Sequence, residues 1–173
     1  MKNKNSNFNM ILILAGVCLI SAGILGLLYS ETREKIEQNR QKRIEKSVYE
    51  VIPGIDSYEG SGEDIKSFKG KKGDHVVGYA VLTEGMGFQG EIELIVGVAS
   101  NMRSITGVRV LDSVETPGLG NKIASKEFLN QFDGLKIPRQ KGIEVEAITG
   151  ATISSQSVQR IINEAIEDAK RIH

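Results

Sequence analysis

An uncharged apolar segment near the N-terminus constrains this chain more than any other feature. From Met10 to Leu28 the sequence is MILILAGVCLISAGILGLL, 19 residues without a charged side chain. As an α-helix it would be roughly 28 Å long, which matches the hydrocarbon thickness of a bilayer. A cleaved signal peptide is the alternative, but its apolar core is usually only about 7–15 residues long and is followed by a small-residue cleavage site, which this sequence lacks. We therefore expect residues 1–30 to form a retained transmembrane anchor.

The segment that follows, residues 31–53, has the pattern of a charged stalk helix. Acidic and basic residues are interleaved there, and pairs such as Glu31/Lys35 have the spacing of helical ion pairs. The pair Pro53-Gly54 is expected to end this helix. Orientation in the membrane stays open, because six Lys or Arg follow the apolar segment while Lys2 and Lys4 precede it without acidic neighbours.

Residues 54–173 have the pattern of a single small α+β domain, an antiparallel sheet with flanking helices. Runs rich in β-branched residues and joined by short turns predict adjacent antiparallel strands, and glycine-rich polar stretches predict loops. Ile92, Leu94, Val96 and Val98 alternate and should share one face of the sheet. The expected elements are strands at 75–83, 91–99 and 105–111, loops at 59–63, 69–73 and 85–90, a short helix at 124–132, and a closing amphipathic helix of about four turns with apolar positions from Val158 to Ile172.

Composition argues against several function classes. The chain has 22 Lys+Arg and 22 Asp+Glu, so it lacks the basic balance of a nucleic-acid-binding protein. Its single cysteine, Cys18, excludes a disulfide framework and an all-cysteine metal site. Only His75 and His173 are available for a zinc site or a serine–histidine–acid triad. We therefore expect neither catalytic side chains nor a metal site in this chain.

Two loops carry the remaining chemistry. The first is the run Glu115-Thr116-Pro117-Gly118-Leu119-Gly120, and the second is Thr149-Gly150-Ala151-Thr152-Ile153-Ser154-Ser155, which leads into the final helix. One interpretation is purely structural: the first run is a turn, and Ser154 or Ser155 caps the helix. The other is an anion site, because hydroxyls and free backbone N–H groups converge at the positive end of a helix.

Together and in this order, the two runs resemble those of FMN-binding domain proteins. The second resembles the motif at which a flavin transferase joins FMN to a threonine through a phosphoester, and the residue that matches the acceptor is Thr152. The first resembles a loop that lies against the isoalloxazine ring in that family. Glu146 stands where the family motif has Asp. The resemblance thus implies covalent FMN at Thr152 and cofactor-binding residues Glu115, Thr116, Pro117, Gly118, Leu119, Gly120, Thr149, Gly150, Ala151, Ser154 and Ser155.

With one N-terminal anchor and this length, the whole chain resembles the RnfG family, the G subunits of Rnf complexes. That resemblance implies a membrane-anchored flavoprotein that relays electrons within a ferredoxin:NAD⁺ oxidoreductase coupled to Na⁺ or H⁺ translocation. Its implied partners are other membrane and iron–sulfur or flavin subunits and a flavin transferase, with the soluble domain on the extracytoplasmic side of the inner membrane. The alternatives are the C subunit of a Na⁺-pumping NADH:quinone reductase, a stand-alone flavinylated electron carrier, and a membrane-anchored adaptor without flavin.

Overall fold

The N-terminal helix α1 (Lys4–Val51) is continuous through the expected anchor and stalk. The computed structural model describes residues 4–60, 66–139 and 141–172, so Lys2 lies outside the described residues. Side chains of the apolar segment are exposed, and one helix of the described chain is long and apolar enough to cross a membrane, with a mean hydropathy of 2.7 over its most apolar window. The chain divides into two compact units, Met1–Lys42 and Arg43–His173.

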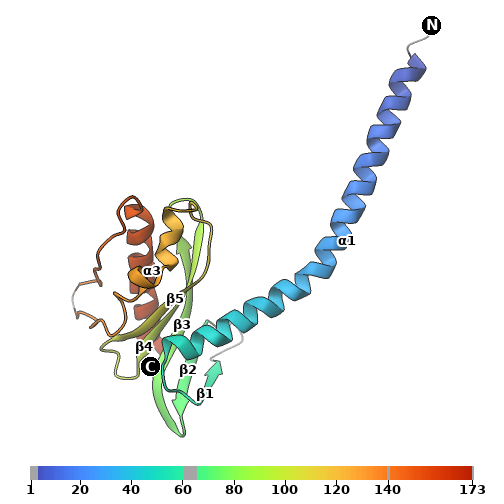
Figure 1. The fold of residues 1–173 in the computed structure, drawn as a ribbon. Coiled ribbons are helices and arrows are strands. Elements are labelled where there is room, and N and C mark those ends of the chain that lie inside the picture. The colour runs from blue at the N-terminus through green and yellow to red at the C-terminus, as the bar shows by residue number, and fades with distance from the viewer. Residues whose placement is uncertain (1–3, 61–65, 140, 173) are drawn as a thin grey trace. The chain divides into compact units, whose positions relative to one another are not determined.

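The second unit contains a five-stranded sheet in which every pair of neighbours is antiparallel (Figure 1). The strands follow one another across the sheet in chain order. The three predicted strands are confirmed, and two of them extend beyond their predicted ends. The strands are β1 (Ser57–Gly60), β2 (Ser67–Lys72), β3 (His75–Met86), β4 (Glu91–Ala99) and β5 (Ile105–Ser113).

The loops expected at 59–63 and 69–73 overlap β1 and β2, so that prediction was wrong at the described residues 59–60 and 69–72. Lys69 to Lys72 belong to β2, with only Gly73 at the turn, where φ is +57°. The run of lysines and glycines hides the strand, because Gly70 is a site of close packing rather than of a turn. A Cβ atom there would lie 2.9 Å from side-chain atoms of both Ile52 and Ile55. Residues 61–63 of the other expected loop lie outside the described residues.

Helix α3 (Thr152–Ile172) covers one face of the sheet and builds the larger core. The expected alternation in β4 is confirmed, because Ile92, Leu94, Val96 and Val98 are all buried in this core. The closing amphipathic helix is also confirmed, although it begins at Thr152 and has 21 residues rather than about four turns. The side chain of Ile172 lies outside the described residues. The buried apolar residues of α3 are Val158, Ile161, Ile162, Ala165, Ile166 and Ala169.

The last turns of α1 cover the opposite face of the sheet. Ile44, Val48 and Val51 pack with Ile52 in a second core against Ala80, Leu82 and Ile95. The backbone at Val51 lies directly against Gly97 and Gly107, its carbonyl accepts a hydrogen bond from the Thr106 hydroxyl, and Glu50 pairs with Arg109 at 2.9 Å. The compact unit therefore begins at Arg43, inside the segment that the sequence assigned to the stalk.

A short helical stretch connects β5 to the segment that precedes α3. Of the helix expected at 124–132, only one turn is α-helical, α2 (Lys126–Leu129), and a 3₁₀ turn, η1 (Gly120–Ala124), precedes it. The division falls at Ser125, whose extended backbone starts α2 and whose hydroxyl accepts a hydrogen bond from the Phe128 N–H. Phe128 and Phe132 are buried in the larger core, which fixes this stretch beside α3.

Candidate functional site

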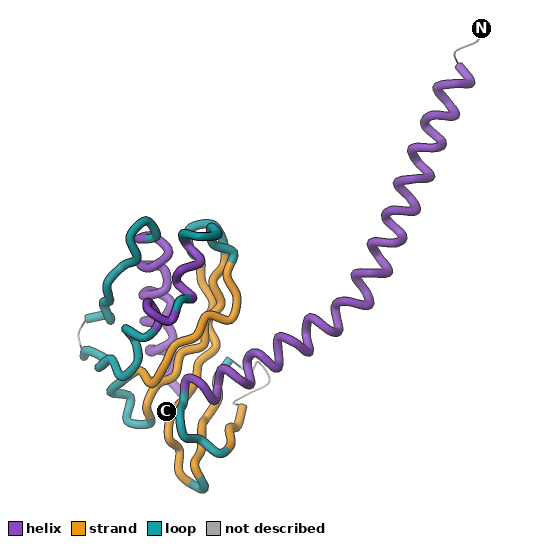
Figure 2. Tube along the Cα trace, in the orientation of Figure 1, coloured by secondary structure: helices purple, strands orange, loops and turns teal. Residues whose placement is uncertain are grey.

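Three loops meet at the end of the sheet where α3 begins (Figure 2). They are the β3–β4 turn (87–90), the loop after β5 (114–119) and the loop before α3 (149–151). Strand register brings the first two together, since Met86 pairs with Glu91 and the Val114 N–H donates to the Glu91 carbonyl at 3.2 Å. The Ser154 hydroxyl donates to Glu115 Oε2 at 2.8 Å, so the two runs singled out in the sequence also lie side by side.

A cavity of about 300 Å³ lies between these loops. This volume is at the lower end of the range of roughly 300–1,000 Å³ for small-molecule pockets. Most of the predicted cofactor-binding residues line it, together with Phe88 and Ile153, which were not among them. The lining residues are Phe88, Thr116, Leu119, Gly120, Gly150, Ala151, Thr152, Ile153 and Ser154.

Phe88 comes from the β3–β4 turn, for which the sequence predicted only a loop. Its side chain is 61% exposed although it lines the cavity. The available signal was a lone aromatic residue inside the glycine-rich run at 85–90, where a large apolar side chain has no packing role of its own. Leu119 and Ile153 are also about half exposed, so the cavity has an apolar rim.

Glu115 does not line the cavity but joins its three walls. The side chain is buried, and Oε1 accepts hydrogen bonds from the backbone N–H groups of Phe88 at 2.6 Å and Gln89 at 3.3 Å. Oε2 accepts a hydrogen bond from the Ser154 hydroxyl at 2.8 Å. One carboxylate thus connects the β3–β4 turn, the loop after β5 and the first turn of α3.

The remaining predicted residues of the first loop shape its backbone. The Thr116 hydroxyl donates to Gln89 Oε1 at 2.9 Å, and the Gly118 N–H donates to Asn121 Oδ1 at 2.9 Å. Gly118 has φ +78°, a conformation that favours glycine. Pro117 and Gly118 are exposed and do not line the cavity.

The start of α3 shows that neither serine is its N-cap. The helix begins at Thr152, so Ser154 and Ser155 lie inside its first turn and the capping interpretation is wrong. The Ser155 hydroxyl donates to the Ala151 carbonyl at 2.9 Å and accepts from the Ile148 N–H at 3.0 Å. Ser155 therefore supports the loop from behind and, like Thr149, does not line the cavity.

Thr152 differs from Ser154 and Ser155 because its side chain is exposed, and it lines the cavity. Within the described part of the chain, its hydroxyl makes no hydrogen bond. The first backbone N–H groups of a helix have no partner inside the helix, and the helix dipole places partial positive charge there. The site therefore combines a free hydroxyl with a local preference for an anion such as phosphate.

Glu146, at the position of the family's Asp, lies away from this cavity. Its side chain is exposed, and its backbone N–H and carbonyl are held by the Gln131 amide at 2.9 and 3.2 Å. Glu146 lines a separate cavity of about 180 Å³ beside Lys122 and Ser125. Among the described residues, no group of three His, Cys, Asp or Glu side chains is placed to hold a metal ion.

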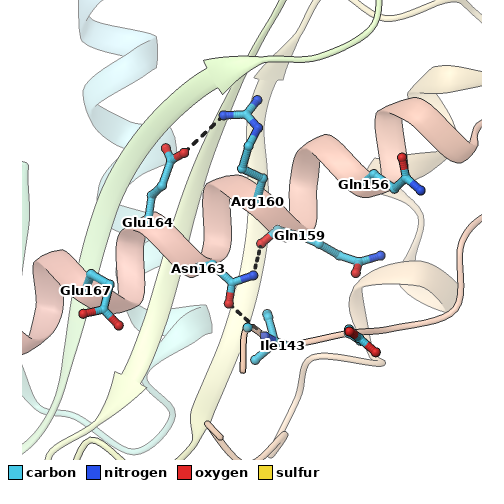
Figure 3. A pocket seen from close by; sticks show the side chains of 9 residues that line it. Ile143, Gln156, Gln159, Arg160, Asn163, Glu164 and Glu167 are labelled. Atoms are coloured by element: carbon cyan, nitrogen blue, oxygen red, sulfur yellow. Dashed lines mark hydrogen bonds and ion pairs between the residues drawn. The ribbon is translucent and has the colours of Figure 1, made fainter. Parts of the chain in front are cut away.

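A larger cavity, about 510 Å³, runs along α3 and contains none of the predicted site residues (Figure 3). It lies beside the extended segment 142–148, which belongs to no strand and is held largely by side chains. In Figure 3, Asn163 accepts a hydrogen bond from the Ile143 N–H at 2.8 Å and Arg160 pairs with Glu164 at 3.2 Å. The Gln159 amide also donates to the Val145 carbonyl at 3.2 Å. Volume alone would therefore have selected a different site.

Comparison with known proteins assigns the chain to a family, and the matched residues include the linings of both cavities. The FMN-binding domain family matches residues 87–167, which include all three loops. The G subunit of the ion-translocating oxidoreductase complex of Methanosarcina acetivorans is 32% identical, with 91% of this chain and 92% of that protein covered. The G subunit of the Na(+)-translocating ferredoxin:NAD(+) oxidoreductase complex of Acetobacterium woodii is 31% identical, with 92% and 90% covered.

Among solved structures, NqrC of Shewanella oneidensis has a TM-score of 0.52 and 21% identity, with 70% of this chain and 72% of that chain covered. This similarity concerns the fold alone, and it supports the predicted α+β class. The similarity to the two G subunits extends over nearly the whole chain on both sides. The chain therefore belongs to the family of G subunits of ion-translocating oxidoreductase complexes, with an FMN-binding domain at residues 87–167.

Proposed function

We propose that this chain is a membrane-anchored flavoprotein subunit that relays electrons within an Rnf-type ferredoxin:NAD⁺ oxidoreductase coupled to Na⁺ or H⁺ translocation. The observation that carries the proposal is the cavity that joins the 115–120 loop to the start of α3, with Thr152 exposed in it. The names and full-length similarity of the two G subunits support the same assignment. The other membrane and iron–sulfur or flavin subunits of such a complex would be its partners.

The residues around the cavity fit FMN. Phe88, Leu119 and Ile153 offer apolar surface for a flat aromatic ring system, and the start of α3 offers backbone N–H groups for a phosphate. When bound, the flavin supplies the electron-transfer chemistry. The chain binds and orients the group and limits the access of water to it.

Thr152 is the proposed site of covalent attachment. Its hydroxyl oxygen would form the bond to the FMN phosphorus, while the bond from that phosphorus to the remainder of an activated flavin nucleotide breaks. The hydroxyl proton would pass to a separate flavin transferase, because no described side chain of this chain forms a hydrogen bond with that hydroxyl. Exposure of Thr152 supports access by such an enzyme.

The test is the mass of the denatured chain after coexpression with a flavin transferase. The wild-type chain should retain one FMN, and Thr152→Val should retain none because the nucleophilic oxygen is gone. Thr83→Val is a matched control, since Thr83 lies on β3 outside the cavity, and it should keep the flavin. Retention of FMN by Thr152→Val would place the attachment elsewhere, with Ser154 the next hydroxyl along α3.

A second candidate function is suggested by the fold that this chain shares with NqrC. In that case the chain would be the C subunit of a Na⁺-pumping NADH:quinone reductase. Similarity to G subunits over about nine-tenths of the chain favours the first candidate. Identification of the subunits that copurify with the full chain distinguishes the two, since iron–sulfur subunits that accept electrons from ferredoxin belong to the first.

A further inference from the structure

A buried carboxylate lies directly behind the wall of the candidate flavin site. Glu115 is 6% exposed, and three hydrogen-bond donors point to its two oxygens: the N–H groups of Phe88 and Gln89 and the hydroxyl of Ser154. Three donors and no acceptor are the surroundings of an ionised carboxylate. Within the described residues, no Lys or Arg forms an ion pair with it.

Two glycines leave room for this carboxylate on opposite walls. A Cβ atom on Gly120 would lie 2.6 Å from Oε2, and a Cβ atom on Gly87 would overlap Oε1. Gly87 belongs to the β3–β4 turn, and Gly120 follows the loop after β5. The backbone on both sides therefore closes around the Glu115 side chain as far as glycine allows.

Burial of an unpaired charge is costly, so its retention calls for a compensating gain. Here the compensating hydrogen bonds hold the walls of the cavity. Phe88, Gly120 and Ser154 all line the cavity, while Glu115 itself does not. Loss of the carboxylate would release the β3–β4 turn from the start of α3. It would also remove a negative charge that sits one residue behind the lining.

We propose that Glu115 is a positioning residue of the flavin site, which fixes the cavity before FMN is attached and lowers the reduction potential of the attached group. The inference rests on the proposed function. Its first part follows from the hydrogen bonds to three walls of the cavity. Its second part follows from electrostatics, since a fixed negative charge in a poorly solvated region opposes the addition of electrons nearby.

Two substitutions separate the two parts. Glu115→Gln keeps the shape, because its amide oxygen can accept from the two N–H groups and its amide nitrogen can donate to Ser154, but it removes the charge. Glu115→Ala removes both. Asn163→Ala is the matched control, since Asn163 also holds a backbone N–H, that of Ile143, but lines the other large cavity.

The experiment measures amide hydrogen exchange and the flavin midpoint potential on the full-length chain in detergent. In Glu115→Ala without flavin, exchange at Phe88 and Gln89 should rise at least about tenfold, as expected for the loss of a hydrogen bond to a charged acceptor. Glu115→Gln should keep that protection and a normal flavin content, and its midpoint potential should be more positive than that of the wild type. Asn163→Ala should change neither quantity.

A different result would overturn each part of the proposal. Unchanged exchange at Phe88 and Gln89 in Glu115→Ala overturns the positioning role, and an unchanged potential in Glu115→Gln overturns the electrostatic one. If Glu115→Ala does not fold, loss of the Phe88 and Gln89 protection in Glu115→Ser, measured on folded protein, replaces it. A wild-type chain that carries no flavin would refute the proposed function, while the exchange measurement would still decide the positioning role.

Discussion

Gly118 and Gly120 lie two residues apart in the first loop, yet the fold requires them for different reasons. Gly118 has φ +78° and open space around the position of a Cβ atom. Gly120 has no such strain, but a Cβ atom there would lie 2.6 Å from Glu115 Oε2 and 3.1 Å from the Ser154 hydroxyl. One position is limited by backbone conformation and the other by packing.

We therefore predict unequal costs for the two alanine substitutions. Gly118→Ala should lower the free energy of unfolding by about 1 kcal/mol, the cost of a left-handed conformation. Gly120→Ala should lower it by up to about 3 kcal/mol through overpacking, and it should also disturb the visible flavin spectrum by displacing Glu115 or Ser154. Urea denaturation followed by circular dichroism measures both free energies of unfolding. Equal costs with an unchanged spectrum would show that Gly120 is merely a turn residue.

For individual residues, the sequence indicated which residues gather at the site better than it indicated what each one contacts. Thr116, Leu119, Gly120 and Thr152, which are among the predicted site residues, line the cavity. Glu115 was grouped with the cofactor-binding residues, but it acts from behind the wall, because its partners Phe88 and Ser154 are distant along the chain and meet it only in the fold. A linear motif identifies which residues gather and does not show which of them face the cavity.

Among the elements, the end of α1 packs on the sheet although its sequence pattern does not predict this packing. Charged residues dominate residues 31–53, so the pattern predicted a solvated stalk. In the fold, every third or fourth position near the C-terminal end of the helix is apolar and buried on the sheet. Strands β1 and β2 escaped prediction because each contains a single large apolar residue, Tyr58 in β1 and Phe68 in β2.

We predict that the soluble unit tolerates removal of residues 1–42 but not of residues 1–53. Loss of Ile44, Val48, Val51 and Ile52 would uncover the second core, at about 1.5–3 kcal/mol for each buried side chain. The combined loss of roughly 6–12 kcal/mol is comparable with the whole stability of a domain, about 5–15 kcal/mol.

Thermal unfolding of the two truncated chains measures this difference. Residues 43–173 should melt cooperatively, and residues 54–173 should be unfolded or aggregated at room temperature. Both chains contain the complete sheet and α3, so they differ only in the end of α1 and the turn that follows it. Equal melting temperatures would mean that the sheet face needs no cover from α1.

For the whole molecule, the sequence pattern does not decide on which side of the membrane the domain lies. Basic residues flank the apolar segment on both sides, so the charge rule gives no clear orientation. We propose the extracytoplasmic side, because a domain as large as residues 54–173 reduces the influence of stalk charges and because flavin attachment outside the cytoplasm, which the family resemblance implies, requires Thr152 to be reachable there.

We predict that a cysteine at Gly60, in a Cys18→Ser background, is labelled in intact cells by a membrane-impermeant maleimide. Gly60 is exposed at the end of β1, which makes the thiol reachable. The Cys18→Ser chain without the new cysteine should not be labelled. Labelling of the Gly60→Cys chain only after lysis would place the domain in the cytoplasm and would contradict the proposed orientation.

The extended segment 142–148, which precedes the 149–151 loop of the candidate site in the chain, is attached to the domain without strand pairing. Its links to α3 come from Gln159, Asn163 and Ser155, so no strand ladder has to break for it to detach. Detachment would uncover Ile143, which is buried in the larger core, and break the hydrogen bonds between Gln131 and the Glu146 backbone, but it would leave the sheet and α3 intact. Under the proposed function, a flavin transferase would meet Thr152 where this segment, which no strand ladder holds, leads into a continuous helix.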